Sequence, residues 1–237
     1  MSTLPRVRAP ERMDAPDVDP RELARSLDDL RGVNRWLGGT RAALAEIVPM
    51  LRHFALARAR VLDVATGSGD IPVELARWGR RSGTPVEVVA TDLHARTVEA
   101  ARARVDDPDV RVERADALDL PYPDLAFDVA MCHTALHHFD PAEAVAVLGE
   151  LGRVAARGVV VTDLRRSRAG LLGARLLAAT VWRRHPVTRH DGPRSVRAAY
   201  TSDELRALAE EAGLEGARVR RRPVFRLSLC WLRPEAT

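Results

Sequence analysis

The segment VLDVATGSGD, residues 61–70, decides the fold of this chain. It starts as a short apolar run, which is typical of a buried strand, and leads into a helix-like stretch that begins at Ile71. Gly67 and Gly69 lie between the two, where glycine lets the backbone turn tightly and approach a ligand closely. A strand, a glycine turn and a helix in this order predict an α/β domain with a ligand at the turn.

Short apolar runs continue to alternate with helix-like segments downstream of this turn. The runs are VEVVATD (86–92), VRVERAD (110–116), FDVAMCHT (127–134) and GVVVTDL (158–164), and the helix-like segments cover residues 71–80, 95–105 and 141–156. Strands that alternate with helices predict a parallel sheet covered on both faces. The nearly continuous apolar character of the runs agrees, because central parallel strands are buried on both sides.

The end of the chain breaks the alternation. A helix-like segment at 202–212 is followed by two adjacent strand-like runs, 217–222 and 224–232. Two strands joined by so short a turn pair as antiparallel neighbours. The predicted fold is therefore α/β and Rossmann-like, with a seven-stranded, mostly parallel sheet, one antiparallel strand, helices on both faces and extra N-terminal helices.

Residues 1–57 precede the first strand. Prolines and charged residues dominate residues 1–20, which predicts a flexible tail. Apolar residues then recur at helical spacing over 21–53, with a break at Gly38 and Gly39. We expect one domain over 21–237 that begins with a helical lid at 21–57.

Composition excludes several classes of protein. The 237 residues suffice for a core without disulfides or a structural metal, and the two cysteines lack the spacing of metal ligands. The 37 basic residues, all arginine, exceed 33 acids by only four and form short, separate clusters, so we expect no nucleic acid partner. The longest apolar stretch, 169–182, contains Arg175 and is too short to span a membrane. Residues 1–20 contain no apolar run of signal-peptide type, so we expect a cytoplasmic protein.

Three aspartates lie beside the predicted glycine turn. Asp63 precedes the first glycine by four residues, where a carboxylate would repel a pyrophosphate and suit a cationic or amine-bearing ligand. Asp92 ends the second strand, 25 positions after Gly67, where a carboxylate can accept both ribose hydroxyls of an adenosine. Asp116 ends the third strand on the same edge. A nicotinamide-dependent oxidoreductase is an alternative, although Pro72 replaces the third small residue of the dinucleotide fingerprint.

Four segments together resemble the class I S-adenosylmethionine-dependent methyltransferases, and within them the small-molecule branch with the ubiquinone and menaquinone methyltransferases. The segments are DVATGSG (63–69), ATDL (90–93), RADA (114–117) and FDVAMCHTALHHF (127–139). The resemblance is strong over residues 60–164 and implies S-adenosylmethionine as the cofactor. It implies that Asp63 and the backbone of Ala65 to Gly67 contact the methionine amino group.

The resemblance also implies the remaining cofactor contacts. These are Gly69 in the loop, Asp92 with Leu93 at the ribose, Asp116 with Ala117 at the adenine and His133 at the sulfonium. If the predicted lid at 21–57 seals the cofactor from water, Arg35 or Trp36 would contact the methionine carboxylate or the acceptor. Methyl transfer is an in-line displacement in which alignment of the reactants supplies much of the catalysis. A phenol or enol acceptor would benefit from a general base, for which His190, followed by Asp191, and His138 are the candidates.

The acceptor is expected to be a small hydrophobic molecule, aromatic or polyketide-like, that is methylated on oxygen or carbon. In the family that this chain resembles, residues 165–200 form an insertion that covers the acceptor. Its apolar residues would form the walls, and polar anchors would come from His190, Tyr200 and Arg35; the walls are Leu171, Leu172, Leu176, Leu177 and Trp182. No metal is expected, and the chain would act as a monomer or homodimer.

Two further alternatives keep the same fold. The chain could bind the cofactor without catalysis, because a fold does not establish an activity. It could also methylate RNA or protein, although CHTALHH at 132–138 differs from the motif typical of amino-group methylation on bases.

Overall fold

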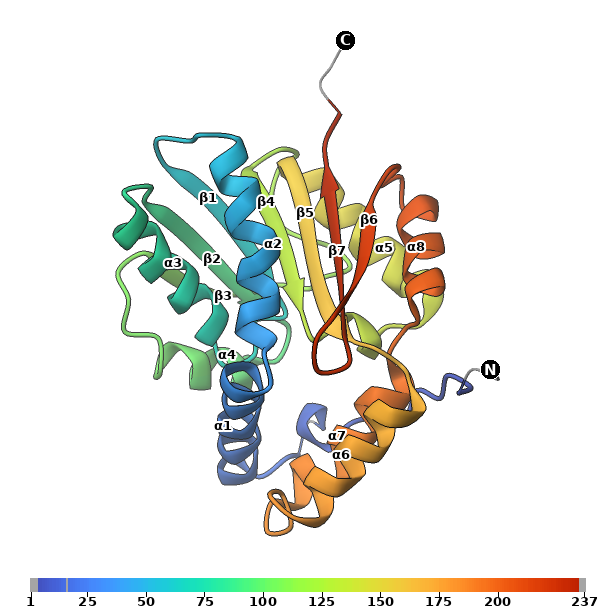
Figure 1. Ribbon diagram of the computed structural model, residues 1–237. Coiled ribbons are helices and arrows are strands. Elements are labelled where there is room, and N and C mark those ends of the chain that lie inside the picture. Colours follow the sequence, from blue (N-terminus) through green and yellow to red (C-terminus); the bar gives the residue numbers. More distant parts are fainter. Residues whose placement is uncertain (1–3, 16, 235–237) are drawn as a thin grey trace.

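The computed structural model describes residues 4–15 and 17–234 and contains one seven-stranded sheet (Figure 1). The strand order is β3-β2-β1-β4-β5-β7-β6. The strands are β1 (Ala59–Val64), β2 (Val86–Asp92), β3 (Val110–Arg114), β4 (Phe127–His133), β5 (Ala155–Leu164), β6 (Arg218–Arg222) and β7 (Arg226–Leu232). The helices are α1 (Pro20–Trp36), α2 (Gly39–His53), α3 (Asp70–Ser82), α4 (Ala95–Arg102), α5 (Pro141–Val154), α6 (Arg168–Ala179), α7 (Pro186–Ala198) and α8 (Ser202–Glu211), with 3-10 turns η1 (Arg12–Asp14) and η2 (Leu136–His138).

The predicted topology is confirmed. Strands β1 to β5 are parallel to one another, whereas β7 runs antiparallel to both β5 and β6. The reversed strand is thus β7, the second of the two strand-like runs at the end of the chain. Its first residue, Arg226, consequently lies at the edge where the parallel strands end, beside Leu164 of β5.

Helices cover both faces of the sheet with separate apolar cores. Helices α5 and α8 pack on one face through residues such as Leu148, Leu151 and Leu205. Helices α2, α3 and α4 pack on the other through residues such as Ile47 and Leu75. Within the predicted lid at 21–57, α2 instead covers the sheet, whereas residues of α1 line the cavity at the sheet edge.

Three helices lie beyond the edge at which the parallel strands end. Figure 1 shows α1, α6 and α7 gathered there with η1, below the sheet in that view. Helix α6 packs against α7, and α7 contacts both α1 and η1. Among the described residues, no helix is both long and apolar enough to cross a membrane. The apolar segment at 169–182 forms α6 and the turn after it, over the sheet edge.

The N-terminal segment differs from the predicted flexible tail. The Val7 amide donates to the Arg197 carbonyl at 3.1 Å, and the amides of Arg12 and Met13 donate to the Asp191 carboxylate at 3.0 and 3.1 Å. Glu11 is buried. Composition predicted disorder because few apolar residues are present, but polar contacts with distant parts of the chain hold residues 4–15. Residues 1–3 and 16 of the predicted tail lie outside the described residues.

Candidate active site

One cavity of about 1330 Å³ opens at the carboxyl edge of the sheet. The glycine turn, the ends of β1 to β5, the N-terminal segment, α1, α6, α7 and the β6–β7 turn all contribute to its lining. A site for one small molecule typically measures about 300–1000 Å³. The cavity therefore has room for two ligands side by side.

The glycine turn adopts left-handed backbone angles at alternate positions. Ala65 and Gly67 both have φ of 57°, and Gly69 has φ of 72°. Ala65 and Gly67 both line the cavity. Gly69 lies outside the lining and has a different role: a Cβ there would lie 2.6 Å from the Val105 side chain, so only glycine fits.

Asp92 connects the glycine turn to the end of β2. Its Oδ2 accepts a hydrogen bond from the Gly67 amide at 3.1 Å, and its Oδ1 accepts one from the His94 amide at 3.1 Å. The carboxylate is buried and lines the cavity, and burial raises its pKa above the ordinary value. Each oxygen keeps a further lone pair for a ligand hydroxyl.

The predicted adenine side of the cavity combines a carboxylate with exposed apolar side chains. Asp116 and Ala117 line it, and Asp116 Oδ1 caps its own turn by accepting from the Leu118 amide at 2.9 Å. Leu93 is 44% exposed and Leu118 is 38% exposed, and both line the cavity. Exposed leucines in a concave site are suited to cover a flat apolar ring. Sequence reasoning missed Leu118, although it follows the RADA motif directly.

The floor beneath the glycine turn contains buried polar atoms without partners in the described part of the chain. These atoms are Asp63 Oδ1, Thr66 Oγ1 and His133 Nε2. Asp63 Oδ1 lies 3.9 Å from His133 Nε2, and His133 Nδ1 pairs with the Thr162 hydroxyl at 2.8 Å. Thr66 and His133 line the cavity, whereas Asp63 lies just behind the lining. Unsatisfied buried polar atoms are costly, so a polar ligand at this point would stabilise the floor.

The buried carboxyl of Asp63 makes the floor of the cavity suited to a cationic ligand. Burial raises the pKa of Asp63 to about 8, with smaller contributions from the charges of Asp70 and Asp92. Burial also lowers the pKa of His133 to about 3, helped by the charge of Arg226. A cation beside Asp63 would restore its carboxylate form. The floor therefore fits the ammonium of a methionine group, and the donor set fits S-adenosylmethionine.

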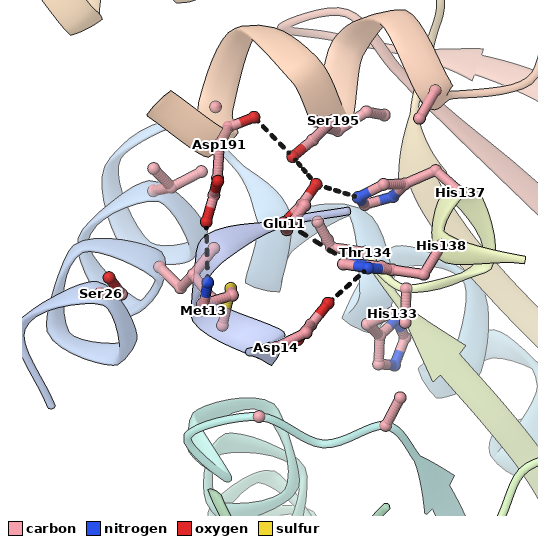
Figure 2. A pocket seen from close by; sticks show the side chains of 18 of the residues that line it. Glu11, Met13, Asp14, Ser26, His133, Thr134, His137, His138, Asp191 and Ser195 are labelled. Atoms are coloured by element: carbon pink, nitrogen blue, oxygen red, sulfur yellow. Dashed lines mark hydrogen bonds and ion pairs between the residues drawn. The ribbon is translucent and has the colours of Figure 1, made fainter. Parts of the chain in front are cut away.

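A second polar cluster lines the same cavity and is centred on His137 (Figure 2). His137 Nδ1 lies 2.8 Å from Asp163 Oδ1, and its Nε2 lies 3.7 Å from Glu11 Oε1. Burial opposes the charge of the ring, but the two carboxylates raise the pKa of His137 to about 10. His137 is thus an imidazolium at neutral pH and supplies a fixed positive charge. Sequence reasoning gave no role to Glu11 or Asp163.

His138, a predicted base, lines the same cluster. Its Nδ1 lies 3.1 Å from Asp14 Oδ2, and its Nε2 lies 3.9 Å from Glu11 Oε2. Glu11 also accepts a hydrogen bond from the Ser195 hydroxyl, and Figure 2 shows it between the two histidines and Ser195. The N-terminal segment thereby supplies two of the carboxylates that orient the cluster.

Two predicted site residues lie away from the cavity. His190 is the other predicted base, but it is absent from the lining, and its Nδ1 lies 2.6 Å from Asp191 Oδ1. Asp191 itself lines the cavity and holds the N-terminal segment. Arg35 does not line the cavity either, because its guanidinium lies over the exposed Trp36 ring, 5.0 Å from the centroid.

The wall formed by α6, α7 and the β6–β7 turn is mostly apolar. Leu176, Leu177 and Trp182 line the cavity as predicted, together with Val224 and Phe225. Val224 and Phe225 both have φ of 55°. Such a backbone is strained for a β-branched residue, and strain of this kind is common at ligand sites.

Three of the predicted acceptor contacts lie elsewhere. Leu171 packs in a small core with Ala174 and Val196, and Leu172 is 69% exposed on the outer side of α6. The Tyr200 hydroxyl donates to the Phe139 carbonyl at 2.8 Å and does not reach the cavity. Helical periodicity explains the difference, because neighbouring residues of α6 face different directions.

A metal ion is not expected at the one cluster of described residues that could hold it. Ligand atoms of Glu11, His137 and His138 lie within 4.8 Å of one another. A metal ligand must be neutral imidazole, whereas His137 keeps its proton at neutral pH. We expect dialysis against EDTA to leave the methyl transfer rate unchanged. A loss of turnover that magnesium or zinc restores would contradict this prediction.

Comparisons with known proteins agree with this geometry. Residues 61–158 match the family model described as "Methyltransferase domain". The chain is 37% identical to demethylmenaquinone methyltransferase of Deinococcus radiodurans over 147 residues, which is 60% of this chain and 55% of that enzyme. It is 32% identical to 27-O-demethylrifamycin SV methyltransferase of Amycolatopsis mediterranei over 161 residues, which is 66% of this chain and 54% of that enzyme. The matches thus span about half the length of these relatives.

Solved structures show the same fold. A SAM-dependent methyltransferase from Aquifex aeolicus superposes with a TM-score of 0.57 at 23% identity, over 78% of this chain and 87% of that one. At this identity the likeness shows the fold alone. The Rossmann-like prediction and the resemblance to class I methyltransferases are both confirmed.

Proposed function

The chain resembles the class I S-adenosylmethionine-dependent methyltransferases in sequence and in fold, and on this premise we propose that it methylates a small hydrophobic molecule. The acceptor is aromatic or polyketide-like, and the methyl group goes to oxygen or carbon. One observation carries the proposal: a single cavity joins a polar half suited to the cofactor with an apolar half suited to an acceptor.

The polar half has the groups that the cofactor requires. Asp92 would accept the ribose hydroxyls, Asp116 would accept the adenine amino group, and Asp63 would compensate the methionine ammonium. When bound, S-adenosylmethionine supplies an electrophilic methyl group on a sulfonium. His133, which lines the cavity and is neutral because burial lowers its pKa to about 3, would border this point without repelling the positive sulfur.

The apolar half excludes water and positions the acceptor. Leu176, Leu177 and Trp182 would contact its rings, and holding two reactants in line can supply about 7–11 kcal/mol of catalysis. His138, which lines the cavity, would take a hydroxyl proton, with Asp14 as a positioning residue. The His137 imidazolium, held by Asp163, would stabilise negative charge on the acceptor oxygen.

Ligand binding and turnover test this proposal together. We expect S-adenosylhomocysteine to bind in calorimetry and nicotinamide dinucleotides to show no binding. Incubation with S-adenosylmethionine and 1-naphthol should give S-adenosylhomocysteine and a methylated naphthol in equal amounts. Nicotinamide binding would favour an oxidoreductase instead, and cofactor binding without turnover on any acceptor would favour a non-catalytic protein.

The raised pKa of Asp63 predicts that cofactor binding releases a proton and that this release depends on pH. Its pKa of about 8 means that most molecules carry a protonated Asp63 at about pH 7 in the absence of ligand. The incoming ammonium favours the carboxylate and lowers this pKa, so binding should release up to about one proton at about pH 7. Above about pH 9 the group is already ionised and the release should vanish.

Calorimetry in buffers with different ionisation enthalpies measures this proton release. The Asp63→Asn variant should bind without the release, whereas Asp106→Asn, at an exposed position outside the cavity, should keep it. Proton uptake, or an unchanged release in Asp63→Asn, would show that Asp63 does not face the ammonium.

A further inference from the structure

Arg226 is the most deeply buried arginine among the described residues. It is 1% exposed, and it begins β7 directly opposite Leu164 of β5. Its side chain nevertheless lines the cavity, at the edge where the parallel strands end. A guanidinium without contact to solvent requires partners for five N–H groups.

The described residues satisfy this guanidinium only in part. Its Nη1 donates to the Thr134 hydroxyl at 3.2 Å, and its Nε has no hydrogen-bond partner in this part of the chain. Arg166, which is also buried, shows the usual arrangement: it forms an ion pair with Glu204 and donates to two backbone carbonyls. Arg226 makes no such ion pair with any described carboxylate.

Asp163, the carboxylate whose charge acts on Arg226, already pairs with His137. Asp163 affects the charge of Arg226, but its Oδ1 pairs with His137 Nδ1 at 2.8 Å, and its Oδ2 accepts from the His137 amide at 2.9 Å. Burial lowers the pKa of Arg226, and Asp163 offsets this only in part. Arginine still keeps its proton at neutral pH.

The start of α2 increases the positive potential around Arg226. A Cβ on Gly39 would lie 3.0 Å from Arg226 Nη2 and 2.3 Å from Asn34 Oδ1, so the helix begins directly against the guanidinium. The amino end of a helix carries a partial positive charge, and Gly38 caps this one without a side chain. A buried positive charge that lacks a counter-ion is destabilising, and an anionic ligand would remove this cost.

The strand order places this positive charge on the acceptor side. Most of the predicted cofactor residues lie on or after β1, β2 and β3, and His133 ends β4, whereas β5 lies between β4 and β7. Arg226 donates to Thr134 and interacts electrostatically with Asp163 and His133. Phe225 directly precedes it in the chain and lines the apolar wall. An anion bound to Arg226 would therefore belong to the second ligand.

We propose that Arg226 forms an anion subsite that binds an ionised oxygen of the acceptor, so that the acceptor is an acidic enol, phenol or carboxylic acid attached to an apolar ring or chain. The assignment rests on the proposed function and narrows its substrate class. An anion subsite at Arg226 would also let the acceptor bind in its deprotonated form beside the His137 imidazolium.

Binding of matched probes tests the subsite without turnover. The probes are 2-hydroxy-1,4-naphthoquinone, which is anionic at neutral pH, and 1,4-naphthoquinone, which is neutral and of nearly the same shape. Calorimetry with saturating S-adenosylhomocysteine should show at least tenfold tighter binding of the anionic probe to the parent protein. In Arg226→Gln this preference should fall to within twofold, whereas Arg220→Gln, an exposed position on β6, should keep it.

Four outcomes would overturn the proposal. Equal affinity of the parent protein for the two probes would do so, and this arm needs no folded variant. So would an unchanged preference in a folded Arg226→Gln protein. A tenfold loss of S-adenosylhomocysteine affinity in that variant, with the probe preference intact, would assign the anion to the methionine carboxylate. Methylation without a preference for acidic acceptors would leave the proposed function standing and reject only this subsite.

Discussion

Replacing Asp92 with alanine is expected to weaken the binding of S-adenosylhomocysteine by about 100-fold or more. Hydrogen bonds to a charged group contribute about 1.5–3 kcal/mol each, and the buried carboxylate would accept two of them from the ribose. The change also removes the acceptor that holds the Gly67 amide, so the glycine turn loses its link to β2. The dissociation constant, measured by calorimetry, provides the test.

The Asp92→Asn variant separates binding from folding. Its side chain keeps one acceptor oxygen for the turn but loses the charge, so we expect near-parental thermal stability with most of the affinity loss. The matched control is Asp106→Asn, at an exposed position away from the cavity. If the affinity of a folded Asp92→Asn protein stayed within threefold of the parent value, the cofactor would not lie over Asp92.

Replacing His138 with alanine is expected to lower kcat by roughly 100-fold to 10,000-fold for a neutral phenol such as 1-naphthol, which is the usual contribution of a general base. His138 is the histidine of the cluster that is only half buried, and Asp14 holds its Nδ1 and so sets the orientation of the ring. The loss should be much smaller for 2-hydroxy-1,4-naphthoquinone, because an ionised acceptor has no proton to give up. Steady-state rates for the two acceptors measure this difference.

The matched comparison is His190→Ala, which removes the other predicted base. Because His190 lies outside the cavity lining, we expect its loss to change kcat by only a few fold. A large loss in His190→Ala with full activity in His138→Ala would contradict the placement of the base. An equal loss with both acceptors in His138→Ala would make His138 a positioning residue instead of a base.

Local sequence patterns predicted the sheet because strands and tight turns depend on residues that are close together in the sequence. Runs of β-branched residues and glycine turns specify buried parallel strands whatever the rest of the chain does. Gly67, Asp92 and Asp116 could be placed for the same reason: each follows a strand, and the carboxyl ends of parallel strands meet at one edge.

The second half of the site depends on contacts between distant segments. Glu11 and Asp14 belong to a segment whose composition predicts disorder, and they are held by groups more than 120 positions away, such as His137 and His138. Arg226 cannot be distinguished by sequence from the exposed arginines of the same hairpin, because only its register opposite Leu164 turns it into the cavity. The neighbouring Asp191 favoured His190 as the base, and the pair exists, but of its two members only Asp191 lines the cavity.

A competition experiment tests the central claim most directly. The purified chain is incubated with S-adenosylmethionine that carries a deuterated methyl group and with an equimolar mixture of aromatic phenols, acidic enols and small polar amines. Mass spectrometry then identifies which molecules gain the labelled methyl group. We predict label on the phenols or enols, with S-adenosylhomocysteine formed in equal amount and no label on the amines; label on the amines alone would contradict the account.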